Sequence, residues 1–207
     1  FDPELYKAQA DCIVIDSGHG HSRPVIDMVL YIKKKYPLLP LMAGNIATVE
    51  GARALIEAGC DMLRVGMGPG SICTTRIVPG MGVPQLTAIT NAVEAVKGSN
   101  VTVIADGGVR QIGDMAKALA CGAHAVMLGS LLARYDESPG DTVTLKNKKY
   151  KRYRGMGSVE AMRKGGAERY GQSSRDAKKD MIAEVIDGFV AYEGSANEYR
   201  VRRGTEE

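Results

Sequence analysis

The sequence predicts an α/β fold in which helices cover a parallel sheet, and three observations support this class. Short apolar segments alternate with amphipathic helical patterns over the first 133 residues. The apolar residues within each segment are continuous, as in strands that are buried on both faces. Each segment also ends in glycine or polar residues, which is typical of the carboxyl edge of a parallel sheet that carries a site.

Five expected strands alternate with helices along the chain. β-branched residues favour the strands, as in CIVIDSG and VTVIADGG. Thr48 is a suitable N-cap for the second helix. The expected strands are residues 12–18, 40–45, 62–67, 101–108 and 125–133, the last of which is expected to run on into a helical turn. The expected helices are residues 24–36, 49–58, 84–97 and 112–120.

Two parallel architectures fit this order, a doubly wound open sheet and a (β/α)8 barrel. A dinucleotide-binding sheet carries GxGxxG in its first βα turn, and DSGHGHS does not match that motif. Five strand ends that converge on one site favour the barrel. A closed barrel needs eight strands and about 250 residues. We therefore expect five βα units here, and either three further strands outside the printed sequence or segments that are missing within it.

Composition limits the possible partners. The 207 residues carry a formal net charge of +3, which is no argument for binding to nucleic acid. No apolar run approaches about 18 residues, the length that a membrane span needs. The four cysteines form no CxxC pair, which fits a reducing compartment, and no signal peptide opens the chain. The expected location is the cytoplasm.

The pattern changes after about residue 138. ESPGDTVTLKNKKYKRYRGMGS resembles a hairpin followed by a glycine loop, and residues 164–179 are polar and charged. From residue 141 to 180 there are twelve Lys and Arg against five Asp and Glu. Such a basic insertion beside the last strand suits either a mobile active-site element, whose charge attracts phosphate-bearing ligands, or a solvated surface excursion. We expect a barrel over residues 1–140, this insertion over 141–194 and a tail over 195–207.

Cys73 is the first candidate for chemistry. A lone cysteine is more often a small buried apolar residue, and Cys12, Cys60 and Cys121 fit that role because they lie in or beside apolar elements. Cys73 instead lies in the glycine loop GMGPGSICTTR, where main-chain N–H groups and Arg76 favour a nucleophilic thiolate. The glycines also allow main-chain carbonyls to ligate a monovalent cation.

Glycines at the ends of the fourth and fifth strands suggest a nucleotide site. Asp106 suits a ribose diol, and the N–H groups of Gly107, Gly108, Gly129 and Ser130 suit a phosphate. Asp16 and Asn45 end neighbouring strands, where a carboxylate suits a second ribose. His124 precedes a strand and is expected to be structural, whereas His19 and His21 lie in a strand-end loop.

Several motifs together resemble one family. GPGSICTTR, IADGGVRQIGDMAKALACGAHAVMLGSLLA, ESPG, YRGMGS and ERY are similar to the catalytic barrel shared by inosine-5′-monophosphate (IMP) dehydrogenase and GMP reductase. The resemblance runs from residue 10 to 194 in uninterrupted order. It implies a homotetrameric (β/α)8 barrel whose first three strands, and a regulatory CBS pair, are not in the printed sequence.

The resemblance also implies a role for each matching residue. Cys73 matches the nucleophile that attacks C2 of the purine, Thr75 matches a further catalytic residue, and Arg169 and Tyr170 match a flap dyad whose arginine activates water. The cofactor side is matched by Asp16, Ser17, Asn45, Arg64 and Gly66, and potassium by the backbone carbonyls of Gly68, Gly70 and Cys73. The nucleotide side is matched by Ser71, Asp106, Gly107, Gly108, Gly129, Ser130, Tyr153, Gly155, Met156, Gly157 and Glu184.

Three functions stay open at this point. In the dehydrogenase, the thiolate adds to IMP, hydride passes to NAD, and water hydrolyses the thioimidate to XMP; Arg169 and Tyr170 favour this reaction. In the reductase, the thiolate adds to GMP, ammonia leaves and NADPH delivers hydride; Thr75 and Glu184 serve that reaction as well and do not discriminate. The third function is purine-nucleotide binding without catalysis, which an intact Cys73 disfavours.

A few positions depart from the family pattern. Gly18 stands where Ser or Ala is usual, and Arg134 and Tyr135 stand where small residues are usual. The glycine that usually follows Glu184 is absent, and SANEYRVRRGTEE does not resemble the usual C-terminal helix with its further potassium ligands.

Overall fold

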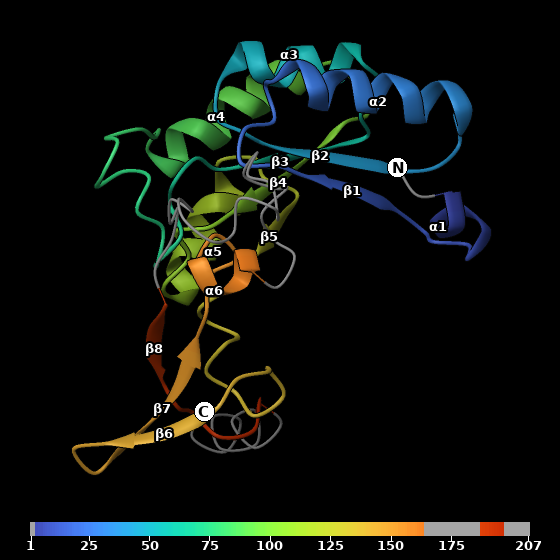
Figure 1. Cartoon of the computed structure of the whole chain (residues 1–207). Helices are drawn as coiled ribbons and strands as arrows, with labels where there is room; N and C mark the ends of the chain where they lie inside the picture. Colours follow the sequence, from blue (N-terminus) through green and yellow to red (C-terminus); the bar gives the residue numbers. More distant parts are fainter. Residues whose placement is uncertain (1–2, 164–186, 197–207) are drawn as a thin grey trace. The chain divides into compact units, whose positions relative to one another are not determined.

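The chain divides into two units in the computed structural model, which describes residues 3–163 and 187–196 (Figure 1). The first unit comprises Phe1–Pro69, Thr75–Gly108 and Ile112–Met127. The second comprises Gly70–Thr74, Val109–Gln111 and Leu128–Glu207. No helix in the described ranges is long and apolar enough to cross a membrane.

The first unit contains the predicted parallel sheet. Its strands pair in the order β1-β2-β3-β4-β5, so each strand lies beside the next one along the chain. This confirms an α/β fold with a five-stranded parallel sheet. The strands are β1 (Ile13–Asp16), β2 (Leu41–Ile46), β3 (Met62–Val65), β4 (Thr102–Asp106) and β5 (Ala125–Met127).

Helices alternate with these strands as predicted. Figure 1 shows α2 (Arg23–Lys35), α3 (Val49–Glu57) and α4 (Gln85–Val96) lying side by side along one face of the sheet. α5 (Ile112–Ala120) leads into β5, and a short α1 (Pro3–Lys7), which was not predicted, precedes β1. The Thr48 prediction is confirmed, because its side chain accepts a hydrogen bond from the Gly51 N–H at 3.1 Å.

Burial differs among the strands of the sheet. β2 is buried at five of its six positions, and only Met42 is half-buried. In β3 and β4 the fully buried Leu63, Val65 and Val103 alternate with the half-buried Met62 and Ile104. The continuous apolar pattern therefore corresponds to nearly continuous burial in β2 and to alternating burial in β3 and β4.

The last strand of the sheet is shorter than predicted. β5 ends at Met127, and the Gly129 carbonyl then accepts hydrogen bonds from the N–H groups of Leu132 and Ala133, both at 3.0 Å. The apolar residues after Met127 therefore form the helical turn that was expected to follow the strand.

The second unit contains a three-stranded antiparallel sheet in the order β6-β7-β8. β6 (Thr142–Leu145) and β7 (Lys148–Tyr153) form the predicted hairpin. Its turn residues Lys146 and Asn147 have φ of 48° and 61°, as a two-residue hairpin turn requires. β8 (Gly188–Ala191) was not predicted, and a short α6 (Val159–Ala161) is capped by Ser158.

Residues 134–138 lie beside residues 192–196 within this unit. The Arg134 carbonyl accepts the Glu193 N–H at 3.1 Å, and Glu137 accepts hydrogen bonds from Ser195 Oγ at 2.7 Å and from the Ala196 N–H. Lys151, only 2 % exposed, donates to the carbonyls of Tyr135 and Ser138. The pair Arg134 and Tyr135, which departs from the family pattern, therefore belongs to a segment that anchors the chain after β8.

Candidate functional site

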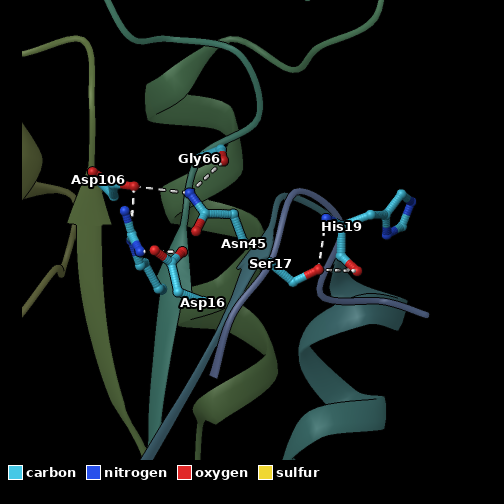
Figure 2. A network of polar contacts seen from close by, with 7 residues as sticks. Asp16, Ser17, His19, Asn45, Gly66 and Asp106 are labelled. Carbon is cyan, nitrogen blue, oxygen red and sulfur yellow. Dashed lines mark hydrogen bonds and ion pairs between the residues drawn. The ribbon is translucent and has the colours of Figure 1, made fainter. Parts of the chain in front are cut away.

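Four side chains at the carboxyl edge of the parallel sheet form one polar network in the first unit. Arg64 donates from Nη1 to Asp16 Oδ1 at 2.5 Å and from Nε to Asp106 Oδ2 at 2.8 Å. Asn45 Nδ2 donates to the same Asp106 oxygen at 2.8 Å and to the Gly66 carbonyl at 2.9 Å. Figure 2 shows Asp16, Asn45 and Asp106 turned toward one another. The structure thus brings together side chains that the sequence assigned to a cofactor side and to a nucleotide ribose.

The local backbone explains how these side chains meet. The β2–β3 register shifts between Gly44 and Ile46, so Asn45 is an extra residue in its strand and its side chain is redirected. A Cβ at Gly66 would lie 2.2 Å from the Asp106 carbonyl oxygen, and the φ of Gly66 is +151°. Only glycine allows β3 to leave the sheet so close to Asp106.

Asn45 has an unsatisfied acceptor within the described residues. The residue is 9 % exposed, and its Oδ1 is buried without a hydrogen-bond partner there. Because a buried acceptor without a donor is costly, this oxygen marks a place where a ligand that carries an N–H or O–H group would fit.

Ser17 holds the loop after β1 onto the end of β2. Its N–H donates to the Gly44 carbonyl at 3.0 Å, and its carbonyl accepts the Asn45 N–H at 3.0 Å. Its hydroxyl accepts the His19 N–H at 3.2 Å. The His19 ring points away from the network in Figure 2. Ser17 therefore supports Asn45 through the main chain.

Arg76 has a role that the sequence did not predict. Its Nε donates to the Met67 carbonyl at 3.2 Å and its Nη2 to the Val83 carbonyl at 2.5 Å, so it joins the two ends of the long loop after β3. A Cβ at Gly68 or Gly82 would lie 2.9 or 2.7 Å from Arg76 Cγ. These glycines make room for the arginine, which we expected to act as a cation beside Cys73.

Cys73 lies in a turn of the second unit. Its N–H donates to the Gly70 carbonyl at 3.1 Å, and its side chain is half-buried, whereas Ser71 is exposed. Ile72 Cγ2 lies 3.5 Å from a Cβ built at Gly188, which is ordinary contact with the first residue of β8. The cysteine turn is thus packed against a strand that the sequence did not predict.

A cavity of about 560 Å³ lies beside this unit's antiparallel sheet. At its wall, a Cβ at Gly129 would lie 2.7 Å from the Tyr153 hydroxyl oxygen, so these two predicted nucleotide residues are in contact. Two arginines supply positive charge. The lining residues are Leu128, Gly129, Leu132, Ala133, Ser138, Pro139, Gly140, Asp141, Arg152, Tyr153 and Arg154.

The remaining cysteines and His124 lie in the first unit, where Cys60 belongs to the core and Cys121 packs against it. Cys60 is buried, and burial raises the pKa of its thiol to about 11; burial also raises the pKa of the Cys12 thiol. His124 Nδ1 accepts the Val103 N–H at 3.0 Å, as a structural residue would. None of the four cysteines forms a disulfide. Within the described ranges, no cluster of three or more His, Cys, Asp or Glu side chains could hold a metal ion.

The predicted site residues therefore fall into three groups. The first unit holds the cofactor-side residues together with Gly68, Thr75, Asp106, Gly107 and Gly108. The second unit holds Gly70, Ser71, Cys73, Gly129, Ser130, Tyr153, Gly155, Met156 and Gly157; of these, Gly155 and Gly157 are buried and Met156 is exposed. Arg169, Tyr170 and Glu184 lie outside the described residues.

Sequence reasoning missed Gln85, the first residue of α4. Its side-chain amide donates to the main-chain carbonyl of Asp106 at 3.1 Å. The only available signal was its position as the first helical residue after the glycine loop.

Comparisons with known proteins agree with these observations. The family profile for the IMP dehydrogenase / GMP reductase domain matches residues 3–202. Inosine-5′-monophosphate dehydrogenase of Escherichia coli strain K12 is 54% identical over 194 residues, which are 94% of this chain and 40% of that protein. The Streptococcus pyogenes protein of the same name is 52% identical over 94% of the chain and 39% of its own length. The chain thus spans about two fifths of these curated relatives, and it belongs to the IMP dehydrogenase / GMP reductase domain family.

Proposed function

We propose that the protein that contains this chain oxidises IMP to XMP with NAD, a step of guanine nucleotide biosynthesis. The observation that carries this proposal is the identity of 52–54% to proteins named IMP dehydrogenase, over 194 residues that include every predicted motif. Two contacts support the proposal. The polar network at the sheet edge joins residues assigned to the cofactor side with Asp106, which is assigned to the ribose of the nucleotide, and the Gly129–Tyr153 contact joins two residues assigned to the nucleotide.

Cys73 is the proposed nucleophile. Its thiolate adds to C2 of the purine and a hydride leaves that carbon, so that a thioimidate joins the nucleotide to sulfur. Water then hydrolyses the thioimidate, which releases XMP and restores the thiol. Arg169, with Tyr170, is assigned to activate that water, and Thr75 and Glu184 complete the assigned catalytic and base contacts.

Asp106 is proposed to bind the ribose of the nucleotide. Among its bonds with described residues, both Asn45 and Arg64 donate to Oδ2, so Oδ1 is the oxygen that suits the sugar hydroxyls. Gly107, Gly108, Gly129, Ser130, Ser71 and Tyr153 are assigned to the phosphate and ribose. Gly155, Met156 and Gly157 are assigned to the base.

The residues present fit the nicotinamide end of NAD. The unsatisfied Asn45 Oδ1 suits the N–H₂ of a carboxamide, and the neighbouring Asp16 carboxylate suits ribose hydroxyls. Ser17, Arg64 and Gly66 hold those two groups in place. When bound, NAD supplies the hydride acceptor.

Potassium is proposed to bind to main-chain carbonyls of Gly68, Gly70 and Cys73. Carbonyl oxygens are suitable ligands for this ion. The Gly70 carbonyl accepts one hydrogen bond, from the Cys73 N–H, and a carbonyl oxygen has a second lone pair for a cation.

We also propose that the sheet belongs to a (β/α)8 barrel completed by three strands outside the printed sequence, in a cytoplasmic homotetramer. The unpaired outer edges of β1 and β5 within the described sheet support this completion, as does Val14 of β1, which is 46 % exposed. Residues 1–140 would form the barrel, 141–194 the flap insertion and 195–207 the tail.

Absorbance at 340 nm tests the proposed reaction. The purified protein should produce NADH from IMP plus NAD, and it should not consume NADPH when given GMP. Consumption of NADPH with GMP, and no NADH from IMP, would assign the reductase reaction instead. Binding of both nucleotides without either reaction would assign a binding role.

A further inference from the structure

We propose that Gln85 is a positioning residue that sets the place of Asp106 for the nucleotide. The inference rests on the proposed function, since that function assigns Asp106 to the ribose. Gln85 has no role in the family match described above, and its side chain reaches from the start of α4 to the carboxyl edge of the sheet.

The Gln85 amide connects β3 and β4 by hydrogen bonds beyond their last paired residues. The last paired residues of β3 and β4 are Val65 and Ala105, and beyond them β3 turns away, because the Gly66 N–H bonds to the Ile46 carbonyl at 2.9 Å. The pairing of β3 with β4 therefore ends at these residues. Gln85 Nε2 donates to one carbonyl of each strand, Val65 at 2.9 Å and Asp106 at 3.1 Å.

Asp106 is thus held from two directions. Gln85 fixes its main-chain carbonyl, while Asn45 and Arg64 fix its carboxylate. The Gln85 amide also packs against Gly66, the first residue after β3, because a Cβ at Gly66 would lie 3.1 Å from both Nε2 and Oε1 of Gln85. A shift of the amide would therefore move the Asp106 main chain and, with it, the carboxylate that faces the ligand.

The side-chain carbonyl oxygen of Gln85 argues against a role in stability alone. This atom, Oε1, is buried and has no hydrogen-bond partner within the described residues. An apolar side chain of similar shape would avoid that cost, so the two N–H donors are the reason for an amide at this position.

The test compares Gln85→Met with Asn91→Leu. Both substitutions remove an amide of α4 that donates to main-chain carbonyls, but the Asn91 amide bonds to the Ala47 carbonyl at 3.1 Å, after β2. Titration calorimetry with IMP is expected to give about tenfold weaker binding for Gln85→Met. Asn91→Leu should bind IMP within about twofold of the unsubstituted protein. In turnover, Gln85→Met should raise the KM for IMP and change kcat little.

A second substitution keeps the proposal testable if Gln85→Met does not fold. Gln85→Lys keeps N–H donors for both carbonyls and should bind IMP within about threefold of the unsubstituted protein. A loss of about tenfold in the IMP affinity of Gln85→Lys, or equal losses in Gln85→Met and Asn91→Leu, would overturn the positioning role. Absence of IMP binding in the unsubstituted protein would instead overturn the proposed function, and this inference with it.

Discussion

Cys60 should make the stability of the protein fall at alkaline pH. The residue is 2 % exposed, and burial raises the pKa of its thiol from the ordinary 9.0 to about 11. A group whose pKa is higher in the folded protein holds its proton more tightly there. The stability that it contributes is therefore complete below pH 9 and is lost as the pH rises through 11.

The size of this effect follows from the two pKa values. Their difference corresponds to about 2.7 kcal/mol in full, of which about 1.3 kcal/mol is lost between pH 8 and pH 10. Urea unfolding of the unsubstituted protein and of Cys60→Ala at both pH values measures it. The cavity left by the substitution lowers the free energy of unfolding equally at both pH values, so it cancels in the comparison.

The unsubstituted protein should lose about 1.3 kcal/mol more than Cys60→Ala between the two pH values. Cys121→Ala, which retains Cys60, should behave like the unsubstituted protein. Equal losses in Cys60→Ala and the unsubstituted protein would refute the reasoning, because ionisation of Cys60 would then have no part in the alkaline destabilisation.

Three further predictions concern the site. Gly129→Ala places a Cβ 2.7 Å from the Tyr153 hydroxyl and should weaken IMP binding about tenfold by calorimetry. The control Gly113→Ala, whose Cβ lies in open space on α5, should leave IMP binding unchanged. Equal IMP affinities of the two variants would contradict the assigned contact. Arg76→Ala should speed hydrogen exchange across the loop between Met67 and Val83, and unchanged exchange would show that the two hydrogen bonds do not hold it. Arg169→Ala should keep a burst of NADH but slow steady-state turnover by about 10² to 10⁴-fold, and loss of the burst would place the arginine in hydride transfer instead.

Much of the first unit could be predicted because its signals are local. The parallel sheet follows from short apolar segments separated by helical patterns, and the start of α3 from a threonine three residues before Gly51. The polar residues after each strand could be placed at one edge of the sheet for the same reason. Their mutual contacts, such as Arg64 with Asp16 and Asp106, agree with that placement.

The missed features depend on contacts that are distant in sequence. Gln85 and Arg76 act on main-chain carbonyls, which any residue can offer, so no sequence pattern identifies their partners. β8 has only four residues and pairs with β7 across a long intervening segment. The helical turn after β5 was expected, but the residue at which the strand ends could not be placed, because the apolar residues that follow are alike in a strand and in a turn.

Intact mass spectrometry tests the central claim, that Cys73 carries the nucleotide during IMP oxidation. The protein, mixed with IMP and NAD and quenched in acid, should gain the mass of one IMP less two hydrogen atoms, and peptide mapping should place that mass on Cys73. Cys73→Ala should gain no mass and make no NADH, yet bind IMP within about tenfold of the unsubstituted protein. NADH production by Cys73→Ala, or an adduct on Cys12, Cys60 or Cys121, would contradict the account.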